Sequence, residues 1–183
     1  MSDRVDQVAI RPYRSSDAGR LTVARIRNRD FLQPYEPLRS EGFFTAEGQR
    51  EWIGHTLEDA RFDHAYAFGV FDPETGAVLG HVALSNVSRG GWQNATIGYW
   101  VDQGHNGMGL ATSAVRFAVA FAFDEVRLHR VQGAVMPRNI ASVRVLTKNG
   151  FRHEGSALRY LQINGVWEDH DIYAITKEDL ERI

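Results

Sequence analysis

The stretch Gly104-His105-Asn106-Gly107-Met108-Gly109-Leu110-Ala111-Thr112 decides the architecture of this chain. It follows a segment rich in β-branched and aromatic residues, 95–101, which predicts a strand, and it precedes the apolar segment 110–123, which predicts a helix. A glycine-rich turn therefore leads into a helix N-terminus, where unpaired backbone N–H groups and the positive end of the helix dipole meet. Gly107 and Gly109 leave room for an anion, so the turn would suit a diphosphate.

The same turn has a simpler interpretation, because Gly-x-Gly before a helix also occurs as an ordinary tight turn. The stretch lacks the Gly-Lys-Ser/Thr of nucleotide-binding P-loops. Thr112 stands where a dinucleotide-binding Gly-x-Gly-x-x-Gly would have its third glycine. The spacing thus disfavours nucleoside triphosphates and dinucleotides, and by itself it leaves a plain turn and an anion site both open.

The composition indicates one soluble domain. The 183 residues are 43% hydrophobic, which is enough for a single sizeable core. Lys and Arg number 21 against 23 Asp and Glu, and the net charge of -2 gives no field that would hold nucleic acid. No apolar leader and no apolar run of about 18 residues is present, so we expect a cytoplasmic protein without membrane contact. The absence of cysteine excludes disulfides and a cysteine-bound acyl intermediate.

Four helices are expected. Asp17 suits the N-cap of the first helix, in which Leu21, Ala24 and Ile26 would point inward. Thr45 suits the N-cap of the second helix, and between the two helices a pair of prolines predicts an aromatic-rich loop over 31–38. The third helix is the apolar segment after the glycine turn. The fourth would begin after Asn139 and stop at Asn149-Gly150.

The remaining segments read as strands. Turn signals at 72–76 and at Asn164-Gly165 separate runs that pair as hairpins. We expect an α+β fold with a mixed, mostly antiparallel sheet of six or seven strands and about four flanking helices. One domain would cover 8–176, with a loose segment at 1–7 and a short tail at 177–183. The expected strands are 8–13, 65–71, 78–87, 92–101, 131–136, 151–163 and 166–175.

The order of strand, Gly-x-Gly turn, helix, strand, helix after Asn139 and Gly150-Phe151 resembles that of the GNAT superfamily of acetyl-CoA-dependent N-acetyltransferases. Three stretches resemble its RimJ branch, the ribosomal-protein-alanine N-acetyltransferases, with the RimL enzymes close by: Asn28 to Arg39, Leu84 to Gly90, and Met136-Pro137-Arg138-Asn139 through Asp169-His170. The resemblance implies two splayed central parallel strands that admit the pantetheine of acetyl-CoA. It also implies direct acetyl transfer, in a ternary complex, to the N-terminal α-amine of a ribosomal protein, with alanine or another small residue first.

The resemblance further implies which residues form the two substrate sites. Coenzyme A would be bound by the glycine turn, the strand before it and the start of the later helix, that is by Trp100, Val101, His105, Asn106, Gly107, Met108, Gly109, Leu110, Ala111, Thr112 and Asn139. The acceptor would contact Phe31, Tyr35, Glu36, Asn86 and Tyr160. No metal is expected, because strand alternation points the members of Glu168-Asp169-His170-Asp171 to opposite faces. The protein would be a monomer or a homodimer.

Two positions depart from the family pattern. Gly104 stands where Arg or Gln is usual, which leaves His105 or Asn106 to supply a side-chain contact to phosphate. Leu146 stands where many members carry the tyrosine that serves as general acid. Ser142 lies one helical turn before Leu146 on the same helix face, so we expect it to be the acid, although it also suits helix capping.

The general base is expected to be Glu154, at a position that resembles the catalytic glutamate of RimL-like enzymes. A glutamate in a strand is more often solvated or ion-paired. Glu36 is its competitor and could instead bind the ammonium of the substrate. Tyr160 is a second candidate acid, although a tyrosine in a hairpin more often serves packing.

Two other functions remain open at the level of sequence. One is acetylation of a small amine such as an antibiotic, a polyamine or an amino acid, and the other is a weakly catalytic acetyl-CoA-binding module that docks to a protein. A peptide acceptor would need an open channel between 31–39 and the Asn164-Gly165 hairpin, whereas a small amine would need a closed pocket. A docking module would bind acetyl-CoA without consuming it.

Overall fold

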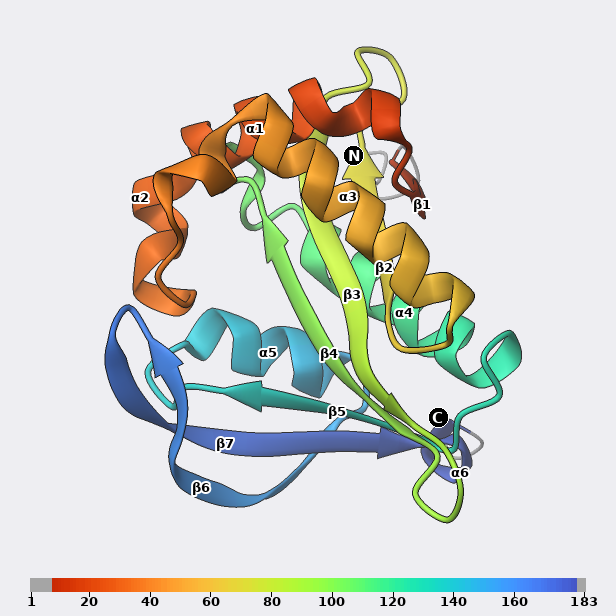
Figure 1. The fold of residues 1–183 in the computed structure, drawn as a ribbon. Helices are drawn as coiled ribbons and strands as arrows, with labels where there is room; N and C mark the ends of the chain where they lie inside the picture. Colours follow the sequence, from red (N-terminus) through yellow and green to blue (C-terminus); the bar gives the residue numbers. More distant parts are fainter. Residues whose placement is uncertain (1–7, 181–183) are drawn as a thin grey trace.

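The computed structural model describes residues 8–180 and folds them around one seven-stranded sheet (Figure 1). The strands are β1 Ala9–Pro12, β2 Tyr66–Phe71, β3 Val78–Ser88, β4 Asn94–Val101, β5 Arg130–Val135, β6 Arg152–Ile163 and β7 Val166–Thr176. The α-helices are α1 Ala18–Arg27, α2 Arg29–Leu32, α3 Ala46–Arg61, α4 Leu110–Asp124, α5 Ile140–Lys148 and α6 Lys177–Leu180. Short 3-10 turns add η2 Ser15–Asp17, η3 Gln33–Tyr35, η4 Glu41–Phe44 and η5 Gln103–His105.

The strand order is β1-β2-β3-β4-β5-β7-β6, and every neighbouring pair is antiparallel except β4 and β5. The expected hairpins are confirmed, because β2 pairs with β3 and β6 pairs with β7. The mixed, mostly antiparallel sheet of the sequence prediction is therefore confirmed at its upper strand count.

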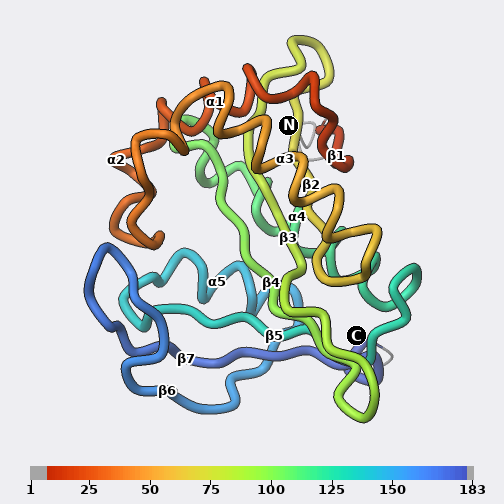
Figure 2. The backbone as a smooth tube through the Cα atoms, in the orientation of Figure 1, coloured from red at the N-terminus to blue at the C-terminus, as the bar shows by residue number. Residues whose placement is uncertain are grey.

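The parallel pair β4 and β5 is joined only at its start. Backbone pairing runs from Asn94 opposite Arg130 to Thr96 opposite Gln132 and then stops, although both strands continue. The strands diverge beyond this point (Figure 2). The backbone groups of β4 that face β5 beyond Thr96 lack strand partners, which confirms the expected splay and opens a gap in the middle of the sheet.

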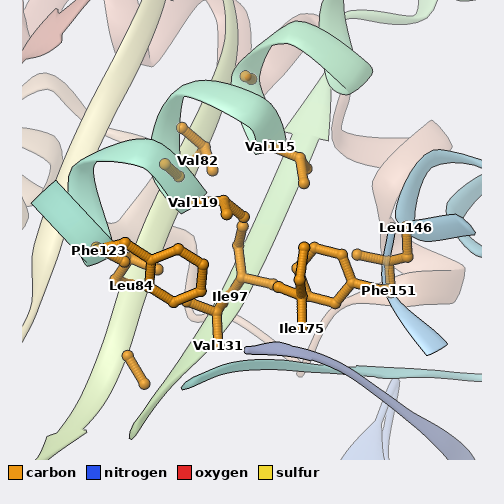
Figure 3. Packing of buried hydrophobic residues seen from close by; sticks show 14 of the residues in the cluster. Val82, Leu84, Ile97, Val115, Val119, Phe123, Val131, Leu146, Phe151 and Ile175 are labelled. Carbon is orange, nitrogen blue, oxygen red and sulfur yellow. The ribbon is translucent and has the colours of Figure 1, made fainter. Parts of the chain in front are cut away.

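Helices cover both faces of the sheet. On one face α1 and α3 pack against β2 and β3, and on the other α4 and α5 pack against β3, β4 and β5 (Figure 1). The main core lies under α4, where residues such as Val82, Ile97, Val119 and Phe123 are fully or nearly fully buried (Figure 3). A second cluster under α1 and α3 includes Trp100. These two clusters hold the splayed strands from either side.

Three local expectations are wrong. Asp17 does not cap α1 with its side chain, since its carboxylate accepts the backbone N–H of Arg14 and pairs with Arg11 at 2.8 Å. Ile26 points outward and is 55% exposed, because buried Arg25 takes the inward position. The aromatic-rich loop after α1 contains a single helical turn, α2, before its first proline.

The segments at the two chain ends fall partly outside the described residues. The predicted loose segment 1–7 and the last residues 181–183 lie outside them. The first part of the predicted tail is instead the short helix α6, whose Asp179 accepts the backbone N–H of Thr176 at 2.8 Å. No helix within 8–180 combines the length and the apolar character needed to cross a bilayer.

Candidate active site

A cavity of about 450 Å³ occupies the gap between β4 and β5. Its walls come from the splayed ends of both strands, from β3 and β7, from α3, from the start of α5 and from the segment after α1. Among the residues expected to bind substrates or to act in catalysis, it is lined by Tyr35, Glu36, Trp100, Asn139 and Ser142. The cavity thus brings residues expected on the donor side, such as Trp100 and Asn139, together with residues expected on the acceptor side, such as Tyr35 and Glu36, at the point where the sheet is open.

The glycine turn lies at the end of β4 and is shaped for a backbone-bound anion. Gly107 has φ 76° and Gly109 has φ 82°, conformations that favour glycine, and a Cβ at Gly107 would meet no atom within 4 Å. The backbone N–H groups of Leu110, Ala111 and Thr112 begin α4 and have no carbonyl inside the helix to bind. Met108 is exposed at the tip of the turn.

Asp102 holds the start of this turn. Its carboxylate, in a residue only 3% exposed, accepts hydrogen bonds from Arg27 Nε at 2.6 Å and Asn28 Nδ2 at 2.7 Å. It also accepts the Gly104 N–H at 3.1 Å and His105 Nδ1 at 2.9 Å. Burial alone would raise the pKa of Asp102, but the hydrogen bonds from Asn28, His105 and Arg27 outweigh it and hold the pKa below its ordinary value.

These contacts limit what can replace the missing Arg or Gln at Gly104. Because a carboxylate can only accept, His105 Nδ1 is the donor to Asp102, and Nε2 is left for a ligand. Asn106 is exposed, and its side-chain amide makes no hydrogen bond within the described chain. Both side chains remain candidates for a phosphate contact.

Ser142 faces the cavity and is hydrogen-bonded to a tyrosine. Its Oγ lies 2.8 Å from the Tyr99 hydroxyl, which also lies 3.1 Å from the Ser142 carbonyl oxygen. The side-chain cap of α5 is Asn139, whose Oδ1 accepts the Ser142 N–H at 3.2 Å, so the Ser142 hydroxyl is not used for capping. Burial raises the pKa of Tyr99 to about 12. Leu146, by contrast, is fully buried against β5 and offers no polar group.

The strand residues expected near the thioester differ in their placement. The Trp100 indole lines the cavity, and the Arg25 guanidinium lies 4.6 Å from the centre of the indole ring. The buried indole Nε1 of Trp100 has no hydrogen-bond partner in the described chain. The Val101 side chain packs instead with Leu79 and Leu110, under the start of α4. A contact from Val101 to a donor therefore has to come from its backbone.

Glu154 lies outside the cavity. Its carboxylate pairs with Arg130 at 2.5 Å and with Arg152 at 3.0 Å. Arg130 is the first residue of β5, where β5 is still paired with β4. The hydrogen bond from Arg130 lowers the pKa of Glu154, which makes the carboxylate a weaker base. This placement does not bring the predicted base to the acceptor site. The ion-pair role that sequence reasoning kept open is the one that the geometry supports.

Two histidine side chains, to which the sequence analysis gave no role, line the cavity. His170 is 3% exposed, and its Nδ1 donates to the Glu168 carbonyl oxygen at 3.0 Å, which leaves the Nε2 lone pair free to accept a proton. His81 is buried on β3, with Nδ1 3.2 Å from the Tyr13 hydroxyl. Burial, assisted by the charge of Arg25, lowers the pKa of His81 to about 3 and keeps this ring neutral.

The acceptor side is closed at one end by hydrogen bonds. Asn164, in the turn between β6 and β7, donates its backbone N–H to the Glu36 carbonyl oxygen at 3.0 Å and accepts from Gln33 Nε2 at 2.9 Å. The hairpin turn lies beside the segment after α2 in Figure 1. The Glu36 carboxylate accepts from Arg25 Nη1 at 2.9 Å. No open channel therefore runs between these two segments at this point.

Three expected acceptor contacts lie away from the cavity wall. Phe31 packs against the second core cluster. Asn86 is exposed in a left-handed conformation with φ 52°. Tyr160 is 40% exposed, with its ring centre 5.8 Å from that of His170, so it lies behind a residue of the wall and not in it.

Tyr99 and His170 could have been found in part from the sequence. Tyr99 directly precedes Trp100, which was expected to face the donor, and His170 lies in the run that was set aside as a metal site. No sequence signal shows that Tyr99 meets Ser142, because 43 positions separate the two and only the packing of α5 on β4 joins them.

A splayed parallel pair that ends in a glycine turn at a helix N-terminus, with a cavity in the splay, defines the GNAT class of acyl-CoA-dependent transferases. The family model described as "Acetyltransferase (GNAT) domain" matches residues 7–152, and the chain belongs to this family.

The similarity extends over whole chains. The chain is 42% identical over 175 residues to "Probable N-acetyltransferase YjcK" of Bacillus subtilis, covering 96% of this chain and 97% of that protein. A ribosomal-protein-S5-alanine acetyltransferase structure from Vibrio fischeri is similar with a TM-score of 0.90, at 36% identity and 94% coverage of both chains. A structure of Mycobacterium smegmatis RimJ in complex with CoA-disulfide has a TM-score of 0.89, at 33% identity, covering 94% of this chain and 83% of that one.

Proposed function

We propose that this enzyme transfers an acetyl group from acetyl-CoA to the N-terminal α-amino group of a ribosomal protein. The first residue of this acceptor would be alanine or another small residue. The observation that carries this proposal is the cavity in the splay, which brings the Tyr99–Ser142 pair and the acceptor-side groups into one space. The similarity to the Vibrio fischeri and Mycobacterium smegmatis enzymes supports the choice of acceptor.

The donor side of the proposal rests on the glycine turn and the open strand edge. The backbone from His105 to Thr112 would hold the pyrophosphate, and the unpaired edge of β4 together with the Asn139 amide would meet the pantetheine. A lone Gly-x-Gly could have been a plain turn, but the left-handed glycines at a long helix N-terminus fit a bound diphosphate. Acetyl-CoA would supply the acetyl group as an activated thioester.

The chemical step needs a group that stabilises the departing sulfur. Ser142 is proposed to donate its hydroxyl hydrogen there. The one hydroxyl hydrogen of Tyr99 can reach the Ser142 carbonyl oxygen or Ser142 Oγ, and in the proposed step it donates to Oγ, which leaves the Ser142 hydrogen for the sulfur. Because α5 begins beside Ser142, the helix dipole also lowers the cost of negative charge nearby.

The amine must lose a proton, and His170 is the base that the geometry favours. Its Nε2 carries a free lone pair because Nδ1 donates to the Glu168 carbonyl oxygen, and the ring lines the cavity. Glu36, fixed by Arg25, is proposed to hold the incoming ammonium. Glu154 is too distant in the fold from the cavity wall to be proposed for either task.

The proton balance favours an α-amine over a lysine amine. An α-amino group with a pKa near 8 is about one-tenth neutral at pH 7, whereas a lysine amine near 10.4 is neutral in roughly one molecule in 2,500. Deprotonating the lysine would need about 3 kcal/mol more help. A single imidazole without a paired carboxylate suits the easier amine.

The test compares two matched peptide sets by liquid chromatography and mass spectrometry. One set begins with a free Ala, Ser or Gly, and the other carries the same sequence with a blocked N-terminus and one lysine. We expect acetylation at the α-nitrogen of the first set and near-inertness of the second. Faster modification of the blocked lysine peptides would refute the α-amine proposal, and binding of acetyl-CoA without turnover of any amine would favour the docking module.

A small amine is the second candidate function, and the hydrogen bonds of Asn164 favour it. They join the two segments, 31–39 and the Asn164-Gly165 hairpin, between which a peptide was expected to need an open channel. Including spermidine, alaninamide and aminoglycosides in the same assay separates the candidates. Turnover of these amines at rates above those of every peptide would make the small amine the better reading.

A further inference from the structure

Arg39 lines the acceptor side of the cavity and carries a positive charge that no acidic group balances within the described residues 8–180. Its two neighbours in the adjoining small cavity are both paired: Arg25 with Glu36 at 2.9 Å, and Arg29 with Glu41. Arg39 has no carboxylate within 4.0 Å in this part of the chain, and its guanidinium lies over an aromatic ring. The acceptor side therefore has one uncompensated cation.

The side chain of Arg39 is placed by Phe43. The guanidinium lies 4.8 Å from the centre of the Phe43 ring, and the Arg25 guanidinium lies 5.3 Å from the same ring. Stacking on an aromatic face leaves the N–H donors of the guanidinium free, and their planar fork matches a carboxylate. Arg39 is thus partly oriented and retains its capacity to donate hydrogen bonds.

An unbalanced cation is unfavourable in a site for amines. The acceptor arrives mostly as an ammonium ion, and the guanidinium of Arg39, which is exposed at the cavity wall, repels it. The Glu36 carboxylate carries a single negative charge, which faces Arg25 and, in the proposed function, the incoming ammonium, so it leaves the charge of Arg39 unbalanced. The repulsion disappears if the acceptor itself carries a negative group that pairs with Arg39.

We propose that Arg39 binds a carboxylate of the acceptor, so that the enzyme prefers N-termini with Asp or Glu among their first few residues. This inference rests on the proposed function and specifies its substrate class. An extended peptide advances about 3.3–3.6 Å per residue, so a scan over positions two to four places the carboxylate at successive distances from the bound amine. The α-carboxylate of a free amino acid offers the same chemistry and is the alternative source.

The experiment measures kcat/KM for Ala-initiated peptides that carry Glu or Gln at position two, three or four. For at least one position we expect the Glu peptide to be favoured about three- to thirtyfold, between the effect of an exposed ion pair and that of a charge-assisted hydrogen bond. Arg39→Gln should abolish the preference, and Arg39→Glu should reverse it in favour of a lysine at the same position. Arg61→Gln, at the exposed end of α3 and outside the cavity, removes the same charge and should leave the preference intact.

The outcomes separate this inference from the proposed function. Acetylation of all α-amines without any Glu preference, or a preference that survives Arg39→Gln, overturns the role of Arg39 and leaves the α-amine acceptor standing. If no peptide reacts, the proposed function fails. The acetylation rates of alanine, which carries a carboxylate, and of alaninamide, which does not, are then compared. A preference for alanine that Arg39→Gln removes then supports the carboxylate site with a free amino acid as its source, and equal rates overturn it.

Discussion

At the scale of single residues, we propose that the Tyr99–Ser142 pair takes the place of the acid that Leu146 cannot provide. The pKa of Tyr99 is raised to about 12, whereas an ordinary thiol has a pKa near 8.5. Neither hydroxyl is acidic enough to give its proton up to a thiolate outright. Their proposed contribution is a hydrogen bond that would stabilise the charge on sulfur as it develops, and this contribution would be lost when the donor is removed.

Ser142→Ala should therefore lower kcat by roughly ten- to a thousandfold with the KM for acetyl-CoA little changed, as expected for a group that acts in the transition state. Tyr99→Phe should lower kcat less, and the double variant should resemble Ser142→Ala, because the two hydroxyls act as one unit. Steady-state kinetics measure all three. Thr147→Ala, on the same helix with its hydroxyl bonded to Val143, is the control. Additive losses in the double variant would separate the roles of the two residues.

The choice of base has its own test. His170→Gln should lower kcat at neutral pH by about a hundred- to ten-thousandfold, the range for a lost general base. Glu154→Gln should leave kcat near that of the native enzyme, because the carboxylate pairs with Arg130 outside the cavity. Rates on an Ala-initiated peptide decide between them. The opposite pattern would return the base role to Glu154.

At the scale of elements, the glycine turn is held in place before any ligand arrives. Asp102 fixes the backbone of Gly104 and is itself held by Arg27 and Asn28 of the α1 end, while buried Leu110 starts α4. The N–H groups at the start of α4 are thus presented in one fixed geometry. Binding of the proposed diphosphate would cost little rearrangement, which favours affinity.

Gly109→Glu should abolish acetyl-CoA binding, because it places a bulky anion where the phosphates would lie. Calorimetry of the folded variant measures the affinity. Gly90→Glu is the matched control, since Gly90 also has a left-handed φ of 67° and meets no atom within 4 Å at its Cβ position, but it lies in the turn between β3 and β4. Unchanged affinity in Gly109→Glu would remove the donor site from this turn.

The elements themselves were largely readable from the sequence. Thr45 and Asn139 accept the backbone N–H groups that their cap positions predict, and Asn164-Gly165 turns the last hairpin. The predicted N-cap role of Asp17 was wrong because its carboxylate forms an ion pair with Arg11. The inward orientation predicted for Ile26 was wrong because the neighbouring Arg25 is buried instead. Hydrophobic spacing cannot show that Arg25 pairs with Glu36 and lies over the Trp100 ring.

At the scale of the whole molecule, the site is a meeting of distant segments. The cavity wall takes residues from the α1 end and the segment after it, from α3, from the four strands β3, β4, β5 and β7, and from α5. A pattern along the chain can therefore indicate which residues belong to the site but not which of them are in contact. Glu154 shows the limit: its position along the chain predicted a base, and its partner Arg130 is visible only once β5 and β6 are placed on either side of β7.

The same assembly buries the titratable imidazole of His81, and the free energy of unfolding should therefore depend on pH. His81 is enclosed by Tyr13, Trp52 and Trp100, and its pKa is lowered to about 3 from an ordinary value of 6.5. Between these two values the unfolded chain binds a proton that the folded chain does not. The His81 contribution to stability is therefore complete above pH 6.5 and is lost as the pH falls from there toward 3.

For His81 this loss amounts to about 2 kcal/mol between pH 7 and pH 5, at about 1.4 kcal/mol per pH unit for one proton. His81→Gln keeps a polar group for the Tyr13 hydroxyl but cannot titrate, so its free energy of unfolding should fall less steeply over this range, even if it is lower at pH 7. Urea unfolding at pH 7, 6 and 5 measures both slopes, with His55→Gln as the control because His55 is exposed on α3. Equal slopes for the native protein and His81→Gln would mean that His81 is protonated in the folded state, and the neutral ring in the cavity wall would have to be given up.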